Sequence, residues 1–195
     1  MKRTQIIQHL INKCSAKKYL EIGMGDGLNF YNISCNYKVS VDPSATVPVT
    51  YKLTSDDFFL QNNEIFDVIF IDGLHMDAQV YRDIINSLSC LSEGGYIVCH
   101  DLSPMEEIIQ RYPQSSLSTD WTGDCWKAWV KLKTERSDLD MVVVDTDYGC
   151  GIISRGHQEL TTINQDYTWE LLDKDRKNLL NLISVEEFLL KYEYR

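Results

Sequence analysis

Four residues that can move protons follow two strongly apolar segments of the sequence. Asp72 and His75 come after the first segment, and His100 and Asp101 come after the second. Imidazole titrates near neutral pH and a neighbouring carboxylate can support it, so these side chains suit a general base. Their nitrogen and oxygen atoms are also ligands for a divalent cation. The purely structural alternatives are that His75 caps the following helix and that His100 satisfies a buried backbone carbonyl.

A second group of residues has the composition of a ligand-binding turn. Gly23, Gly25 and Gly27 follow the apolar segment 18–22. Glycines let the backbone turn tightly and approach a ligand closely. Asp42 comes nineteen residues after Gly23, where a carboxylate can accept both hydrogen bonds of a ribose diol. Each feature alone also has a structural interpretation, since glycine and aspartate before proline are common in turns.

The charge of this turn distinguishes two classes of adenosine-containing ligand. A dinucleotide turn has the spacing Gly-x-Gly-x-x-Gly and places a pyrophosphate at a helix N-terminus. Here the spacing is Gly-x-Gly-x-Gly, with Glu21 and Asp26 in or beside it. Two carboxylates repel a pyrophosphate but attract an ammonium and a sulfonium group. The turn therefore favours S-adenosylmethionine over a nicotinamide dinucleotide.

The order of the predicted strands and helices indicates how these residues are brought together. Strands that alternate with helices imply right-handed crossovers, a mostly parallel sheet with helices on both faces, and ligands outside the carboxyl ends of the strands. The predicted strands are 18–22, 38–42, 47–51, 66–71 and 96–99, and the predicted helices are 28–33 and 76–91, the second closed by Glu93-Gly94-Gly95.

The C-terminal half predicts a different arrangement. Its elements are a β-hairpin with strands at 141–144 and 151–154 and two helices at 169–183 and 184–194. Ser184 and Glu187 form a capping box for the last helix. Asp145, Asp147 and Tyr148 flank the hairpin tip and either line a pocket or are ordinary turn residues. The predicted fold class is α/β: a Rossmann-like, doubly wound, mostly parallel sheet with a C-terminal antiparallel β-hairpin and terminal helices.

The composition fits one globular domain. The chain has 195 residues, of which 44% are hydrophobic and 25% charged. Its net charge of −10 disfavours a nucleic-acid partner. With no apolar run long enough to span a membrane and no export signal at the start, we expect a cytoplasmic protein. The six cysteines have no Cys-x-x-Cys spacing, so we expect reduced thiols.

Four stretches of the sequence resemble one family. Residues 19–27 resemble motif I of class I S-adenosylmethionine-dependent methyltransferases, and Val41-Asp42 resembles the acid at the end of their second strand. Residues 70–75 and 94–101 resemble the Ile-Asp-Gly-x-His and Gly-Gly-x-(apolar)-His-Asp patterns of the subgroup that includes small-molecule and sugar O-methyltransferases. The resemblance covers about residues 15 to 105.

The resemblance implies a role for each matching residue. Asp42 would bind the ribose hydroxyls, and Asp72 would lie beneath the cofactor. Ser55 and Asp56 match the place where relatives contact the adenine amino group, although Ser55 also suits a helix N-cap. The residues that would hold the methionine part are Glu21, Gly23, Gly25, Asp26 and Gly27.

The segment 113–133 lies where class I methyltransferases insert substrate-recognition elements, and it contains three tryptophans. We therefore predict such an insertion within a single domain over residues 1–195. Trp126 and Trp129 share one helical face, which predicts an amphipathic helix capped by Asp124 and packed on the sheet. The functional alternative is an aromatic wall for a sugar or another ring.

The predicted activity is methyl transfer from S-adenosylmethionine to a hydroxyl group of a small molecule or sugar. His75 or His100 would be the base, assisted by Asp101. Catechol-type relatives hold a divalent cation between acidic or amide residues at these strand ends, and His100-Asp101 departs from that pattern, so a cation is not favoured. The alternatives are a nicotinamide-dependent oxidoreductase and an S-adenosylmethionine-binding module without catalysis.

Overall fold

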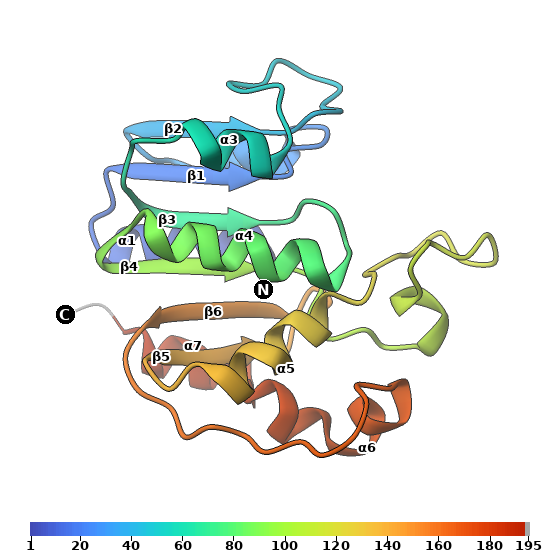
Figure 1. Cartoon of the computed structure of the whole chain (residues 1–195). Helices are drawn as coiled ribbons and strands as arrows, with labels where there is room; N and C mark the ends of the chain where they lie inside the picture. Colours follow the sequence, from blue (N-terminus) through green and yellow to red (C-terminus); the bar gives the residue numbers. More distant parts are fainter. Residues whose placement is uncertain (194–195) are drawn as a thin grey trace.

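One mixed sheet organises residues 1–193, which are the residues that the computed structural model describes (Figure 1). Its seven strands follow the order β2-β1-β3-β4-β6-β5-β7. The strands are β1 (Lys18–Ile22), β2 (Tyr37–Val41), β3 (Phe66–Ile71), β4 (Leu91–Cys99), β5 (Leu139–Val144), β6 (Cys150–Arg155) and β7 (Leu182–Ile183). The predicted α/β class and the antiparallel hairpin are confirmed.

Helices cover both faces of the sheet. In Figure 1, α3, α4, α5 and α6 lie on one face, and α1 and α7 lie on the other. The helices are α1 (Arg3–Lys13), α2 (Leu28–Asn32), α3 (Ser55–Gln61), α4 (Asp77–Ser89), η1 (Glu107–Gln110, a 3₁₀ helix), α5 (Cys125–Glu135), α6 (Trp169–Leu180) and α7 (Val185–Lys191).

The central strand β3 shows why the sheet needs two helical layers. Val68 and Phe70 belong to the core beneath α1 and α7, whereas Ile69 and Ile71 belong to the core beneath α4 and α5. All four side chains are at most 2% exposed. A strand covered on both faces needs an almost unbroken apolar run, because successive side chains point to opposite faces.

The strand register brings the polar residues to one edge of the sheet. Ile22 pairs with Val41 on one side and with Ile71 on the other, and Ile71 pairs with Cys99, all in parallel strands. The residues that follow these four therefore emerge side by side. β6 runs antiparallel to β4 and pairs Gly151 with Cys99, so the tip of the β5–β6 hairpin reaches the same edge.

Several predicted elements differ in the structure. The expected strand 47–51 is wrong, because only Tyr51 forms a bridge, to Val41. The helix predicted over 76–91 ends at Ser89, and Gly94 and Gly95 lie in β4 instead. The predicted capping box of the last helix is confirmed, while its predicted end at residue 194 lies outside the described residues.

The tryptophan helix is part of the core. Trp126 and Trp129 on α5 are fully buried, which confirms an amphipathic helix packed on the sheet. Asp124 is the N-cap residue of α5, as predicted, but its side chain makes no capping bond to this helix and instead accepts the backbone N–H of Asp77, at the start of α4. All six cysteines are free. Among the described helices, none has the length and apolarity of a membrane span.

Candidate active site

Six side chains meet at the carboxyl ends of β3 and β4 and at the tip of the β5–β6 hairpin. We call them the strand-end cluster, and they are Arg3, Asp72, His75, His100, Asp101 and Asp147. The structure thus brings together the four residues expected from the sequence and adds the hairpin residue Asp147. Arg3 was not expected from the sequence.

His75 is the more accessible of the two imidazoles, with its side chain 17% exposed. Its Nδ1 lies 3.1 Å from the carbonyl oxygen of Trp121, which can only accept, so Nδ1 carries a hydrogen. Its Nε2 lies 3.4 Å from Asp72 and 3.3 Å from Asp101. Burial alone would lower the pKa of His75, but these two carboxylates raise it above its usual value. The cap hypothesis is wrong, because Met76 is the N-cap of α4.

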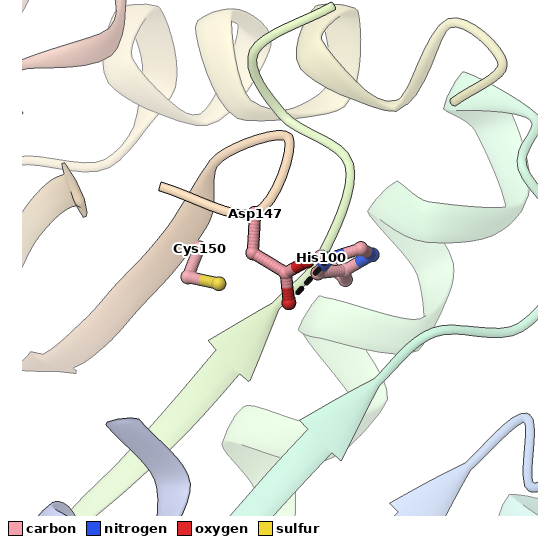
Figure 2. Close-up of side chains that lie close together, drawn as sticks. All are labelled: His100, Asp147 and Cys150. Carbon is pink, nitrogen blue, oxygen red and sulfur yellow. Dashed lines mark ion pairs between the residues drawn. The ribbon is translucent and has the colours of Figure 1, made fainter. Parts of the chain in front are cut away.

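His100 is buried, and one of the carboxylates beside it, Asp147, is drawn in Figure 2. Its Nδ1 lies 3.0 Å from Asp101 and 3.4 Å from Asp72, and its Nε2 lies 3.6 Å from Asp147. Burial opposes the charged form, yet the three carboxylates raise the pKa of His100 well above its usual value. These carboxylates favour the protonated ring, and both ring nitrogens face carboxylates rather than a backbone carbonyl.

Arg3 links two carboxylates of the cluster. Its Nη1 donates to Asp72 over 2.8 Å, and its Nε donates to Asp147 over 2.9 Å. Its backbone N–H also donates to Asp147, over 3.0 Å. Asp101 and Asp147 have φ values of 62° and 50°. Such left-handed backbone is strained for residues with a side chain, and strain of this kind concentrates at functional sites.

A cavity of about 770 Å³ runs from the glycine turn to the strand-end cluster. The sequence-predicted residues on its wall are Glu21, Gly23, Gly25, Asp26, Asp42, Ser55 and Asp72. At the other end the wall includes residues 2–4 and Asp147. Gly27 and Asp56 were also predicted to bind the cofactor but are not on this wall. Gly27 lies against the Tyr31 ring, and Asp56 pairs with Arg82.

Two glycines of the turn have different reasons to lack a side chain. Gly23 has φ +86°, and a Cβ there would lie 2.1 Å from the carbonyl oxygen of Asp72, so it allows close packing of β1 on the next strand end. Gly25 has φ +56°, and a Cβ there would meet no atom within 4 Å. Its N–H donates to Asp42 over 2.7 Å. The open space beside Gly25 is therefore available to a ligand.

Glu21 is a buried carboxyl at the base of this turn, only 1% exposed. Its Oε2 accepts hydrogen bonds from the Tyr19 hydroxyl over 2.5 Å and from the Asn29 amide over 2.9 Å. Burial raises the pKa of Glu21 to about 7, because it outweighs these hydrogen bonds. A cation bound in the cavity would favour the ionised form.

Ser55 lies on the cavity wall together with Gln79. It is not the cap of α3, since the preceding Thr54 accepts the capping N–H, and the N-cap hypothesis for Ser55 is wrong. The Ser55 hydroxyl instead accepts from Gln79 over 3.0 Å, and Gln79 also donates to the buried Asp83 over 2.9 Å. Burial raises the pKa of Asp83 to about 6. Sequence reasoning missed Gln79, which lines the cavity, because a glutamine within a helix carries no distinctive pattern.

Comparisons with known proteins agree with this architecture. Residues 36–102 match a family model described as a methyltransferase domain. A search among curated protein sequences gives no match. An O-methyltransferase from Bacillus cereus, solved with SAH, is 18% identical with a TM-score of 0.58, over 78% of this chain and 80% of that chain.

Two further solved structures are similar. An SAH-bound methyltransferase from Podospora anserina is 18% identical with a TM-score of 0.54, over 79% of this chain and 78% of that chain. The O-methyltransferase TomG from Streptomyces achromogenes, solved with SAM, is 14% identical with a TM-score of 0.55, over 78% of this chain and 79% of that chain. The chain therefore has the class I methyltransferase fold, and the resemblance read from its sequence is confirmed.

Proposed function

We propose that this chain transfers the methyl group of S-adenosylmethionine to a hydroxyl group of a small molecule or sugar. The observation that carries the proposal is the cavity of about 770 Å³, which extends from an acidic glycine turn to Arg3, Asp72 and Asp147 of the strand-end cluster. His75, His100 and Asp101 are not on its wall, and His75 contacts the wall residue Asp72. When bound, the cofactor supplies an electrophilic methyl group. The protein must then align the acceptor and remove its proton.

The residues at the glycine turn fit the cofactor. The cavity wall beside Gly25 is open, and the carboxylates of Glu21 and Asp26 suit its cationic groups. Asp42 already accepts the N–H groups of Gly25 and Ser44, at 2.7 and 2.6 Å. A carboxylate has about four acceptor sites, so capacity remains for ribose hydroxyls. Ser55 and Gln79 would face the adenine end.

His75 is the proposed base. Because Nδ1–H is held by the Trp121 carbonyl, Nε2 is the atom that takes the proton. Asp101 and Asp72 would stabilise the imidazolium that forms. His100 is not assigned this role, since it is buried and its carboxylate neighbours raise its pKa well above the usual value.

Aromatic side chains line the part of the site that we propose for the methyl acceptor. Within the segment 113–133, the buried Trp126 belongs to the core, so Trp121 is the tryptophan proposed to face the acceptor. Its ring lies 4.8 Å from the His75 ring between centroids, with the two planes tilted by 33°. Tyr112, just before this segment, stacks on Trp121 at 6.1 Å. This pair supports the segment 113–133 as a substrate-recognition element.

The proposal extends to partners and location. A net charge of −10 supports a small-molecule acceptor rather than a nucleic acid. Six unpaired thiols support a cytoplasmic location, because reducing compartments keep cysteines free.

Calorimetric titration with SAH tests the cofactor assignment. We expect micromolar binding that Asp42→Ala abolishes, whereas Asp138→Ala, which removes a surface carboxylate, leaves it unchanged. Preferential binding of NAD⁺ would show an oxidoreductase instead. Incubation with isotopically methyl-labelled cofactor and a panel of phenols, catechols and sugars then separates a catalyst from a binding module, since only a catalyst labels an acceptor.

A further inference from the structure

We propose that the Arg3 guanidinium is the resident cation of the strand-end cluster, in the place that a divalent metal ion would otherwise take. The inference rests on the proposed function, and it assigns to the N-terminal segment a part in the reaction site. It follows from the position of Arg3 relative to the carboxylates.

Among the described residues, two groups of side chains in or beside the strand-end cluster have metal-ligand chemistry. Asp72, His75 and Asp101 place one ligand atom each within 4.8 Å of one another, and so do His100, Asp147 and Cys150. Imidazole and carboxylate ligands suit several divalent ions. A divalent ion could bind either group only if the carboxylates of that group had no other cationic partner.

Arg3 binds a carboxylate of each group. Nη1 contacts Asp72 of the first group at 2.8 Å, and Nε contacts Asp147 of the second at 2.9 Å (the Asp147 side of the cluster is visible in Figure 2). A divalent ion in either group would share a carboxylate with this guanidinium and would be repelled by it at close range. The residues present therefore do not fit a divalent metal ion.

The main chain holds Arg3 in this position. Its own backbone N–H donates to Asp147 over 3.0 Å. The Thr146 hydroxyl donates to the carbonyl of Met1. On the other side, the Thr4 hydroxyl donates to Asn29 over 2.7 Å, and Asn29 donates to Glu21. The N-terminal segment is thus tied both to the hairpin tip and to the glycine turn, so the guanidinium is a built part of the site.

Arg3 also retains hydrogen-bond donors toward the cavity. Of its five N–H groups, three serve Asp72 and Asp147, the third through a long 3.5 Å contact from Nη2. Its side chain is 30% exposed and lines the cavity. A guanidinium in this position can donate to the acceptor oxygen and stabilise negative charge as the proton leaves. That is the contribution that a metal ion would make.

Binding of Mn²⁺, followed by electron paramagnetic resonance of the free ion, tests the inference without an acceptor. We expect the wild-type protein to leave the free-ion signal unchanged. Arg3→Gln should bind one ion per chain at least about tenfold more tightly, because two carboxylates lose their partner. Arg136→Gln, which removes an arginine paired with a surface aspartate, should behave as wild type. A folded Arg3→Gln protein that binds Mn²⁺ no more tightly than wild type would overturn the inference.

Further measurements test the inference even if Arg3→Gln does not fold. Arg3→Lys keeps a cation and should resemble wild type toward Mn²⁺. If wild-type protein binds Mn²⁺ and Asp72→Asn abolishes that binding, the inference is wrong. The same holds if EDTA lowers wild-type turnover of an acceptor. SAH titration of the same samples distinguishes a failure of this inference from a failure of the proposed function. Wild-type protein that binds both SAH and a metal ion refutes only the role of Arg3. Wild-type protein that does not bind SAH refutes the proposed function.

Discussion

Binding of the cofactor product should depend on pH through Glu21. This carboxyl has a pKa of about 7, so it is largely neutral below that pH and ionised above it. If the ammonium group of SAH requires the ionised form, the apparent Kd scales as 1 + 10^(7−pH). The factor is about 11 at pH 6 and about 1.1 at pH 8, so affinity should fall about tenfold between them, or about 1.4 kcal/mol. At pH 7 binding should release about half a proton.

Calorimetry in buffers of different ionisation enthalpy measures both quantities. Glu21→Gln should bind SAH more weakly at pH 8, lose most of the pH dependence and release no proton at pH 7. Glu93→Gln changes an exposed glutamate in β4 and should keep the wild-type profile. The charged groups that also act on Glu21 are Lys38 and Asp72. Any dependence of the SAH affinity on pH that remains in Glu21→Gln therefore arises from groups other than Glu21. An unchanged tenfold slope in that variant would refute the reasoning.

Three other predictions follow from single side chains. His75→Ala should lower kcat by roughly 10²- to 10⁴-fold while the SAH affinity stays within about threefold, because it removes a base and no cofactor contact; weaker SAH binding together with normal turnover would contradict this. Gly23→Ala should fail to fold, since its Cβ would overlap Asp72, whereas Gly25→Ala should fold and bind SAH more weakly by calorimetry. Trp126→Ala should reduce the free energy of unfolding in urea by about 3–5 kcal/mol, and Trp121→Ala by much less, because only Trp126 is fully buried; equal losses would disprove that distinction.

The sequence was sufficient for most of the sheet and for four of the six residues of the strand-end cluster. A run such as 66–71 is apolar throughout because both faces are buried, and parallel strands end at a common edge. That rule alone placed Asp72 beside His100. It could not find Arg3, which is 69 residues from Asp72 and meets it only because α1 packs across the sheet.

The errors have physical reasons of the same kind. Thr54 and Ser55 both have a hydroxyl that can cap a helix, and only the point where the backbone leaves its extended conformation decides between them. The sequence does not distinguish which tryptophan of the segment 113–133 lies in the core, but tertiary packing buries Trp126 and leaves Trp121 beside His75. The raised pKa of His100 arises first from Asp72 and Asp101, which the strand ends place beside it, and further from Asp147, whose approach is set by the hairpin register.

The position of β6 between β4 and β5 has a consequence for synthesis on the ribosome. β5 is translated first, yet it joins the parallel strands only through β6, its neighbour in the sheet. The hairpin must therefore dock as a pair once residue 155 has emerged. Until then Arg3 has no Asp147 to bind, so a nascent chain can form the glycine turn long before it has a competent reaction centre.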